Sequence, residues 1–445
     1  MATGPLQPEA EQNLLADDLR ELWPMLSLEE KVEGFRLLPR GEAEELFLSL
    51  GTPAQAELLA PLPPAERQLW IRQLPPDDAA DLLQSVEDEE RESLLRLLDE
   101  PTRREVSALL AYAEDEAGGL MSPRYVRLRP EMSVDEAISY LRRSARERAE
   151  TIYYIYVLDA EQRLLGVVSF RELFAATPDR SVRDVMQADV VSVRDDLDQE
   201  AVARVIAQND LLAVPVVDAE GRIQGIVTVD DIVDVVHEEA TEDIQKIGGT
   251  QALGSPYLQV GVFEMVRKRG VWLTVLFLGQ LLTATAMSYY EDDIARAVVL
   301  ALFIPLIISS GGNSGSQAST LVVRALATHE LRLRDWSRVF LRELATSLML
   351  GLILGSIGLL RIVLWPARER AYGEHFALIG LTVAVSLVWI VVWGSIAGAM
   401  LPFALSRLGL DPASASAPFV ATIVDVTGLV IYFSVATLIL SGTLL

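Results

Sequence analysis

The sequence contains no cysteine and only three histidines among its 445 residues. The absence of cysteine excludes disulfides, iron–sulfur clusters and thiolate zinc sites, and three histidines leave little for a histidine metal cluster. Lysine and arginine are scarce as well, with 38 of them against 63 aspartates and glutamates, so the net charge is −25. A chain this acidic is not expected to bind nucleic acid, because affinity for nucleic acid depends on positive charge.

The acidic residues are unevenly distributed along the chain. Residues 1–266 hold 53 acidic and 25 basic side chains, whereas residues 267–445 hold 10 acidic and 13 basic ones. Hydrophobic residues nevertheless make up 51% of the whole chain. These proportions indicate an acidic soluble part followed by an apolar part, and they exclude a single globular enzyme domain.

Long apolar stretches occur in the second part. Each reaches the ~20 residues that a helix needs to cross the hydrocarbon of a bilayer. The five stretches are Val271–Tyr290, Ala297–Ala327, Leu344–Trp365, Phe376–Leu405 and Phe419–Leu440. Nine lysines and arginines lie on one side of these spans and four on the other. Because basic loops stay in the cytoplasm, we expect the N-terminal half to be cytoplasmic and the C-terminus to lie outside the cell membrane.

The second apolar stretch is polar at its centre. It contains the block Gly311-Gly-Asn-Ser-Gly-Ser-Gln317, in which Asn313 and Gln317 bring amide groups to membrane depth. Small residues in a membrane helix are typical of close packing, with polar side chains bonded across the interface. Polar groups at this depth are tolerated only where protein or water covers them, and the density of polar and small residues in this block favours a pore lining.

The fifth stretch carries Asp425, the sole acidic residue in the interior of any of the five. A carboxylate inside a membrane is costly and indicates function, and no lysine or arginine lies deep enough to pair with it. Asp411, which is followed by proline, is typical of a helix start. If one helix runs on from there, Asp411, Thr422 and Asp425 share a face, with about 21 Å between the two carboxylates. Such a stripe suits a cation pathway rather than an anion pathway.

Residues 120–236 contain an internal repeat. The segment Val157-Leu-Asp-Ala-Glu-Gln-Arg-Leu-Leu-Gly166 recurs as Val216-Val-Asp-Ala-Glu-Gly-Arg-Ile-Gln-Gly225. Each copy alternates short β-branched runs with helical patterns. The repeat resembles a tandem pair of CBS domains, which usually sense ligands rather than catalyse reactions.

The N-terminal residues have the leucine-rich, proline-punctuated pattern of short helices. We therefore predict a multi-domain membrane protein with four parts. They are a helical N-terminal domain (1–118), α/β tandem CBS domains (119–239, dividing between 182 and 183), a connecting helix (240–267) and an all-α domain with five transmembrane helices (268–445).

Acidic residues are densest where the repeat ends. Between Asp195 and Asp243 the chain has 14 acidic residues and only two basic ones. Any single member can simply face solvent, and Asp198 and Glu200 can complement a helix N-terminus. Like charges at this density nevertheless repel, and a compact state needs cations to offset them. Hard divalent ions, held through carboxylates and retained water, fit that need.

These parts together resemble the MgtE family of magnesium channels and transporters over nearly the full chain. The block 311–317 and the pattern Asp411-Pro … Pro418-Phe … Asp425-Val-Thr-Gly428 match the motifs of the family's second and fifth spans. The resemblance implies a homodimer in the lipid bilayer, with a pore between the subunits that the second and fifth spans line. Asp425 would hold hydrated Mg²⁺ there, and the other pore candidates are Asn313, Gln317, Thr422 and Asp411.

The resemblance also implies that the cytoplasmic part senses Mg²⁺. The acids at matching positions are Asp198, Glu200, Asp210, Asp231, Asp234, Glu239, Glu242 and Asp243, with Asp77 and Asp81 in the N-terminal domain as a looser match. Some members of the family bind adenine nucleotide between the CBS motifs. In this chain, ATP bound there would involve Arg171 and the region of Asp218.

We expect a self-limiting Mg²⁺ uptake channel, not an enzyme, that closes when cytosolic Mg²⁺ binds the acidic N-terminal and CBS domains. A proton-coupled secondary transporter, with Asp425 carrying the proton, is the alternative. A membrane sensor without transport fits less well, because Asp425 has no compensating charge and faces a polar second span. A chloride channel with CBS domains is disfavoured by the acidic pathway.

Overall fold

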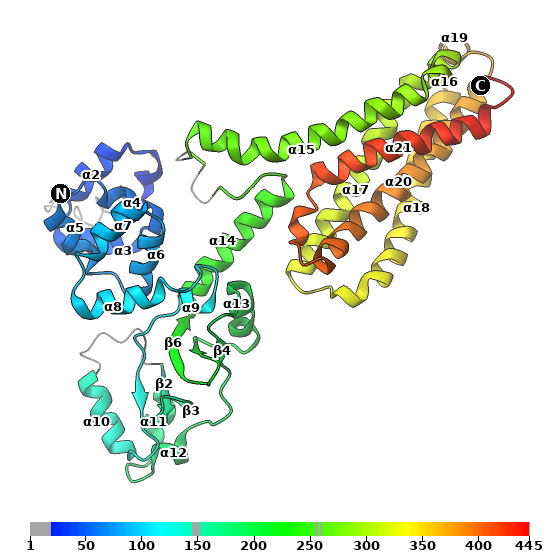
Figure 1. Cartoon of the computed structure of the whole chain (residues 1–445). Coiled ribbons are helices and arrows are strands. Elements are labelled where there is room, and N and C mark those ends of the chain that lie inside the picture. The colour runs from blue at the N-terminus through cyan, green and yellow to red at the C-terminus, as the bar shows by residue number, and fades with distance from the viewer. Residues whose placement is uncertain (1–18, 145–150, 152, 254–256, 259, 445) are drawn as a thin grey trace, which may run out of the picture. The chain divides into compact units, whose positions relative to one another are not determined.

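A computed structural model of the chain describes residues 19–144, 151, 153–253, 257–258 and 260–444 (Figure 1). The chain divides into two compact units, Met1–Glu238 and Glu239–Leu445, and each is described by itself. The division falls inside one helix, which starts in the first unit and ends in the second.

The N-terminal part of the first unit is built from short helices. They are η1 (Trp23–Met25), α2 (Leu28–Leu37), α3 (Arg40–Ser49), α4 (Thr52–Leu59), α5 (Pro64–Ile71), α6 (Pro76–Gln84), α7 (Asp88–Leu95) and α8 (Glu100–Leu109). Several begin with a proline in the first turn, where the missing N–H needs no partner. Phe35, Phe47 and Trp70 pack together in their core, with ring centroids 4.9, 5.6 and 6.5 Å apart. The predicted helical domain is confirmed.

Two three-stranded sheets of the same topology follow. In each, the first strand runs parallel to the second, and the second pairs antiparallel with the third. This part comprises α9 (Ala117–Leu120), β1 (Arg127–Leu128), α10 (Val134–Ser144), β2 (Tyr154–Leu158), β3 (Leu164–Ser169), α11 (Phe170–Ala175), α12 (Val182–Val185), β4 (Val193–Arg194), α13 (Gln199–Gln208), β5 (Ala213–Val217), β6 (Ile223–Thr228) and α14 (Val229–Ile247). The predicted α/β repeat is confirmed.

The connection to the second unit differs from the single helix predicted for residues 240–267. Helix α14 ends at Ile247, and the next helix begins only at Val262. Gly249 ends α14, because its φ of +75° suits glycine and its N–H bonds to the carbonyl of Lys246 at 2.9 Å. The connecting segment is therefore the last part of α14 followed by a stretch that is not helical where the structure describes it.

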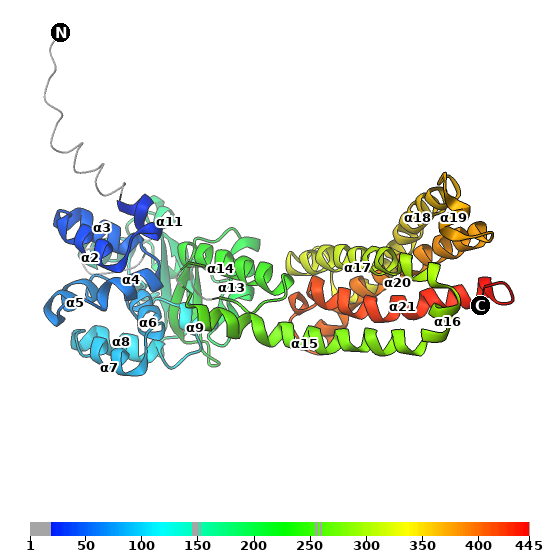
Figure 2. The same cartoon turned by 90° about the horizontal axis from the view of Figure 1, so that it is seen from above.

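The second unit holds five helices that are long and apolar enough to cross a membrane, as the sequence predicted. Its elements are α15 (Val262–Tyr289), α16 (Glu291–Arg296), η2 (Val298–Phe303), α17 (Ile304–Ala327), η3 (Leu333–Asp335), α18 (Trp336–Val363), α19 (Arg368–Tyr372), α20 (Phe376–Arg407), η4 (Pro412–Ser414) and α21 (Ala417–Leu440). Helix α20 packs against α17, α18 and α21, and α15 runs along α21 (Figures 1 and 2).

Glycines allow α17 and α20 to approach each other closely. Gly311 and Gly315 of α17 lie against the backbone of Gly394 and Gly398 of α20, so that a Cβ at these positions meets neighbouring backbone or side-chain atoms. The hydroxyl of Ser314 also bonds to a serine of α20 at 2.6 Å. These members of the 311–317 block therefore serve close packing, which is one of the two interpretations that the sequence left open.

We expect the Gly398→Ala variant to be less stable by about 1–3 kcal/mol, because its Cβ would clash with the carbonyl oxygen of Gly315. The matched control is Gly270→Ala in α15, where nothing lies within 4 Å of the new Cβ. Alanine is favoured over glycine in a helix by about 1 kcal/mol, so the control should be neutral or stabilising. Thermal unfolding of the detergent-purified chain measures both, and equal midpoints would contradict the close approach.

Candidate functional site

Asp425 lies well inside α21, about 12 Å along the helix axis from Ala417. Its side chain is half-buried. The side chain of Gln280 in α15 lies near it. Gly312 of α17 is also close, since a Cβ built there lies 3.8 Å from Oδ1 of Asp425. Among the described residues no basic side chain pairs with this carboxylate, and the amide of Gln280 is its polar partner.

Asn313 and Gln317 lie on the open face of α17. Both are exposed, as are Ser309 and Thr320, and the spacing of three or four residues places all of them along one side of the helix. The amide of Asn313 donates to the hydroxyl of Ser309 at 3.3 Å. The 311–317 block thus has two sides. Its glycines pack against α20, and its amides belong to an exposed polar stripe on α17. A polar stripe in a membrane helix needs cover from protein or water.

The fifth span does not start at Asp411, because the helix is interrupted after it. Asp411 caps the short turn η4, and α21 begins only at Ala417, with Ser416 as its N-cap. The hydroxyl of Ser319 in α17 donates to the carbonyl of Ala415 at 2.7 Å and so satisfies the backbone in the break.

The polar face predicted to run from Asp411 to Asp425 depended on an unbroken helix, and that part of the prediction is wrong. Thr422 and Asp425 do lie within one turn of each other on α21. The hydroxyl of Thr422 donates to the carbonyl of Pro418 at 2.9 Å, which is a local bond within the helix.

In the first unit, Asp81 of α6 and Asp231 of α14 interact electrostatically. Burial raises the pKa of Asp81 to about 7, and the charges of Asp78 and Asp231 raise it further. Burial also raises the pKa of Asp231 to about 7, although its carboxylate accepts a 2.6 Å bond from the hydroxyl of Thr228. Asp77, at the start of the same helix α6, is buried. Two half-buried acids from distant parts of the sequence are therefore near enough to interact electrostatically.

The remaining sensor candidates of the first unit are spread over α13 and α14. Asp198 caps the start of α13 and accepts a bond from the N–H of Glu200 at 2.9 Å, which is the helix-terminus role that the sequence left open. Asp210 follows the other end of that ten-residue helix. Asp234 is exposed on α14. The structure therefore separates Asp198 from Asp210 and brings only Asp81 and Asp231 together.

In the second unit, the end of α14 meets Asp411. The ammonium of Lys246 lies 2.8 Å from Oδ2 of Asp411 and also pairs with Glu242, one turn earlier. Burial raises the pKa of Asp243, and the negative charges of Asp411 and Glu239 add to that effect. Glu242 and Asp411 thus share one lysine, and Asp243 interacts electrostatically with both; we call these three acids the carboxylate cluster, although they are not close enough to one another to hold a single metal ion.

The described residues contain no group of three or more acidic or histidine side chains close enough to hold a metal ion. Sequence reasoning also missed Gln280 and Lys246, which the structure places against Asp425 and Asp411. Gln280 gave no signal, because an amide on a different span reaches Asp425 only through packing. Lys246 could have been noticed, since it is the sole lysine or arginine between Arg222 and Arg267.

A cavity of about 250 Å³ lies between the two CBS-like repeats. Both repeats line it, through residues that include Tyr154, Ser169 and Glu172 of the first and Leu211 and Pro215 of the second. Tyr156 is another lining residue, and its buried hydroxyl has no hydrogen-bond partner among the described residues. Arg171 is exposed and directly precedes Glu172.

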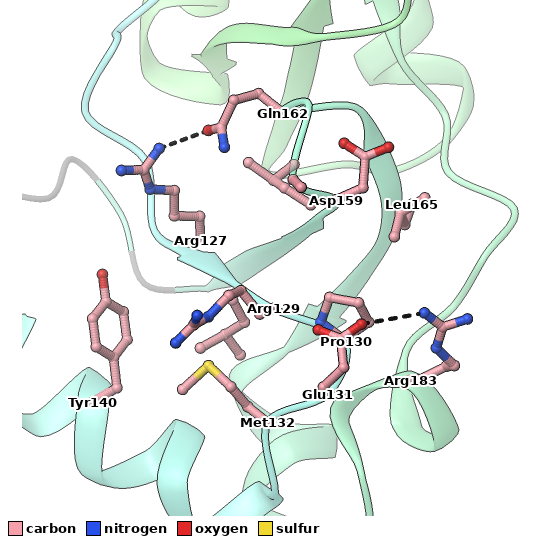
Figure 3. Close-up of a pocket in the computed structure, with 13 residues that line it drawn as sticks. Arg127, Arg129, Pro130, Glu131, Met132, Tyr140, Asp159, Gln162, Leu165 and Arg183 are labelled. Carbon is pink, nitrogen blue, oxygen red and sulfur yellow. Dashed lines mark hydrogen bonds and ion pairs between the residues drawn. The ribbon is translucent and has the colours of Figure 1, made fainter.

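A larger cavity, of about 560 Å³, lies within the first repeat (Figure 3). Arg127, Arg129 and Arg183 line it. Arg127 donates to the side chain of Gln162 at 2.6 Å, and Arg183 pairs with Glu131 at 3.5 Å. All of its lining residues except Arg183, which lies at the start of the second repeat, come from the first repeat, so the cavity belongs mainly to the first copy.

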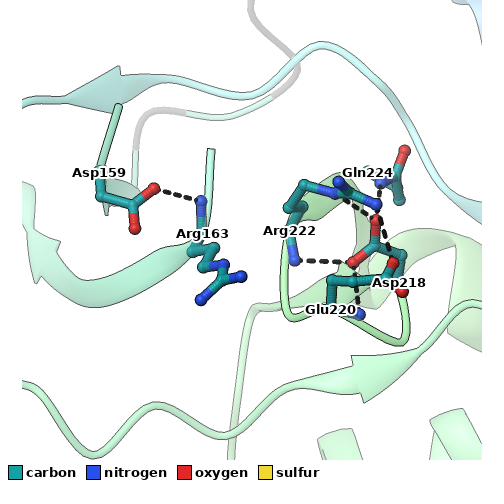
Figure 4. A network of polar contacts seen from close by, with 6 residues as sticks. All are labelled: Asp159, Arg163, Asp218, Glu220, Arg222 and Gln224. Atoms are coloured by element: carbon teal, nitrogen blue, oxygen red, sulfur yellow. Dashed lines mark hydrogen bonds and ion pairs between the residues drawn. The ribbon is translucent and has the colours of Figure 1, made fainter. Parts of the chain in front are cut away.

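Asp218 belongs to the lining of neither cavity. It lies in the turn between β5 and β6, where its carboxylate accepts bonds from the side chains of Arg222 at 2.7 Å and Gln224 at 3.1 Å (Figure 4). The same carboxylate accepts the backbone N–H groups of Glu220 and Arg222. Its contacts are those of a residue that holds a hairpin turn.

Comparisons with known proteins agree on the nature of the chain. A family model for divalent cation transporters, MgtE, matches residues 304–435, a model for the MgtE intracellular N domain matches residues 14–115, and the CBS domain model matches residues 117–179 and 182–238. The magnesium transporter MgtE of Thermus thermophilus is 45% identical over 98% of this chain and 95% of its own length. The magnesium transporter MgtE of Bacillus subtilis is 34% identical over 83% of this chain and 79% of its own.

A solved structure of the cytosolic domain of the Mg²⁺ channel MgtE in complex with ATP is also similar. It is 47% identical and covers 52% of this chain and 95% of its own, with a TM-score of 0.48.

Proposed function

The chain belongs to the MgtE family of magnesium transporters, and we propose that it is a Mg²⁺-selective channel that admits magnesium through the cell membrane and closes when cytosolic Mg²⁺ rises. The observation that carries this proposal is Asp425, a carboxylate inside a predicted span that has an amide partner and no basic one among the described residues. Such a residue is costly to bury in hydrocarbon and fits a cation that passes beside it. The distribution of basic residues between the loops favours a cytoplasmic N-terminal half.

The pore is proposed to lie between two copies of the chain. In one copy, the polar stripe of Asn313 and Gln317 on α17 is exposed and Asp425 on α21 is only half-buried. A second copy related by twofold symmetry would cover this surface with an identical one and bring two Asp425 side chains to one axis. The homodimer would thereby supply two carboxylates and several amides along a single water-filled path.

These side chains suit hydrated Mg²⁺ as the cargo. Mg²⁺ gives up its water reluctantly, so carboxylates and amides can hold it through the retained water. Conduction also requires that binding be weak enough for release. An inside-negative potential supplies about 2.3 kcal/mol per charge for each 100 mV, which is doubled for a divalent cation.

Closure is proposed to depend on the two places where carboxylates are crowded. These are the pair Asp81 and Asp231, and the cluster of Glu242, Asp243 and Asp411. Bound Mg²⁺ would supply there the positive charge that these carboxylates lack. When they are not offset, the carboxylates repel and disfavour the compact arrangement. Mg²⁺ can shift the equilibrium between the compact and the loose arrangement only by the difference between its affinities for the two. The remaining candidates, Asp77, Asp198, Glu200, Asp210, Asp234 and Glu239, would add to the overall negative charge of the cytoplasmic part.

We also propose that the cavity between the CBS repeats takes an adenine nucleotide. Its support is the lining by both repeats and the unpaired hydroxyl of Tyr156. A buried polar atom without a partner is costly, and a ligand that bonds to it would remove that cost. We assign the phosphate contact to Arg171, which directly precedes the lining residue Glu172, whereas the carboxylate of Asp218 holds a hairpin turn.

The pore assignment is tested by Asp425→Asn, which removes one charge and keeps the shape of the side chain. We expect Mg²⁺ uptake to fall at least about tenfold, since each 1.4 kcal/mol of lost ion stabilisation is a factor of ten. The control is Asp292→Asn, an exposed acid on α16 outside the spans. Uptake is measured in cells that lack other magnesium importers, and unchanged uptake would refute the assignment. A reversal potential that also follows the proton gradient would favour the coupled transporter instead.

The gating assignment is tested by neutralising Asp231, Asp234, Glu242 and Asp243 together with amides. Without these charges the compact state gains little from Mg²⁺, so we expect currents to persist at concentrations that close the wild type. Exposed acids of the N-terminal domain serve as the control, with Glu87 and Glu89 changed to glutamine. Patch recording with Mg²⁺ on the cytoplasmic side gives the result. Normal closure of the amide variant would show that divalent bridging is not the mechanism.

Arg171→Ala tests the nucleotide site. Loss of a charge-assisted bond to phosphate should weaken ATP binding by about tenfold, measured by calorimetry on the purified chain. Arg129→Ala, in the cavity of the first repeat, is the matched control and should leave the affinity unchanged. If Arg129→Ala weakens binding and Arg171→Ala does not, the nucleotide belongs in the larger cavity.

A further inference from the structure

Lys246 joins the end of α14 to the segment that leads into the fifth span. Its Nζ lies 2.8 Å from Oδ2 of Asp411 and pairs at the same time with Glu242. Asp411 in turn caps η4, which directly precedes α21 and Asp425. One ammonium group therefore contacts both the helix that carries the acidic cluster and the entrance of the proposed pore helix.

The charges around Lys246 are unbalanced. Glu242, Asp243 and Asp411 surround it, and it is the sole lysine or arginine between Arg222 and Arg267. Partial burial acts to lower the pKa of Lys246, but the bonds and charges of Asp411 and Glu242 outweigh it and raise the pKa. One ammonium stands against three carboxylates here. A net negative charge remains in the cluster even with Lys246 in place.

The packing around Lys246 fixes where its ammonium can reach. Gly249, just after the helix end, sits against Trp272 of α15 and Pro418 of α21. The indole of Trp272 also donates to the hydroxyl of Ser416 at 3.3 Å. Lys246 is thus attached to a helix end that is wedged between two proposed spans, and its side chain is 30% exposed.

There is room for a hydrated cation beside this lysine. A cavity of about 340 Å³ is lined by Glu242, Lys246, Trp272 and Ser414, together with residues of the stretch that follows α14. A water molecule occupies about 30 Å³, so six waters around one small ion need on the order of 200 Å³. Lys246 lines this cavity and holds two of the carboxylates that a divalent ion would use.

We propose that Lys246 is the chain's own counter-cation for Glu242 and Asp411, that it competes with Mg²⁺ for this carboxylate cluster, and that it thereby sets the Mg²⁺ concentration at which the channel closes. This inference rests on the proposed Mg²⁺ gating. A divalent ion that engages Glu242 and Asp411 has to displace the ammonium first. Because the lysine is tethered, it competes at an effective concentration in the millimolar range or above.

Lys246 could instead only stabilise the compact arrangement through its ion pairs, and this role and competition with Mg²⁺ predict opposite results when the charge of Lys246 is removed. If Lys246 competes with Mg²⁺, its loss frees the carboxylates and closure needs less Mg²⁺. If Lys246 only braces the compact arrangement, its loss weakens that arrangement and closure needs more Mg²⁺. An ion pair that is partly exposed contributes up to about 1 kcal/mol, so we expect a shift of about three- to fivefold.

The test uses the full-length protein with Lys246→Met, which keeps the length of the side chain and removes its charge. Lys246→Gln is a second neutral variant in case the first does not fold, and Lys246→Arg keeps the charge. Arg269→Met removes an exposed basic side chain of α15 outside the cluster, so it is the matched control. Two readouts are taken against Mg²⁺: closure in patch recordings, and protease protection of residues 240–261 in the purified chain.

We expect Lys246→Met and Lys246→Gln to lower the half-maximal Mg²⁺ concentration about three- to fivefold in both readouts, with Lys246→Arg and Arg269→Met close to the wild type. An unchanged concentration, or a higher one, overturns the proposal. If the wild type itself neither closes nor becomes protected with Mg²⁺, the proposed gating fails, and this inference fails with it. A wild type that closes normally beside an unshifted Lys246→Met refutes the inference alone.

Discussion

The rest of the structure depends on one constraint, which is electrostatic. Carboxylates that are crowded together or partly removed from water raise the free energy of the folded chain. Asp425 lies inside a proposed span near the amide of Gln280, and Asp81 and Asp231, on two different helices, interact electrostatically. Among the residues that the structure describes, no basic side chain forms an ion pair with any of these three carboxylates. Positive charge from solution is the natural means of lowering this cost. Permeation and sensing can therefore share one physical basis in this chain.

The carboxylates at the end of α14 are the exception, because Lys246 is among them. Asp411 takes part in this contact and precedes the turn that continues into α21. A change in the charge balance at the cluster thus acts on a backbone segment that leads directly to Asp425. This short covalent path makes the end of α14 the place where sensing could be transmitted to the pore, without a long chain of intervening contacts.

Close packing makes the proposed pore surface possible. The glycines of the 311–317 block press against α20, and this fixes which side of α17 remains open. Asn313 and Gln317 then lie on that open side. Ser319 holds the backbone where the fifth span is interrupted, so Asp411 stays at a separate turn and does not join a stripe with Asp425. One helix therefore shapes both the interface and the polar stripe.

Much of the architecture could be predicted from the sequence, because long apolar stretches and a recurring strand–helix pattern are local signals. The five spans, the α/β repeat and the helical N-terminal domain followed from them. Asp425 was also evident, since an acid inside an apolar stretch is costly wherever that stretch packs. The helix breaks at Gly249 and before Ala417 were less predictable, because contacts with other helices satisfy the backbone there.

The sequence alone thus determined which segments are apolar enough to cross the membrane and which acidic residue lies inside such a segment. Both follow from the free energy of transferring side chains from water to hydrocarbon. Tertiary structure alone decided which side chains meet. It divided the 311–317 block between packing and polar stripe, placed Gln280 beside Asp425, paired Asp81 with Asp231 and brought Lys246 to Asp411. These pairs join residues far apart in the chain, or depend on which side of a helix is covered. No local pattern encodes them, since distance in space is set by the packing of whole helices.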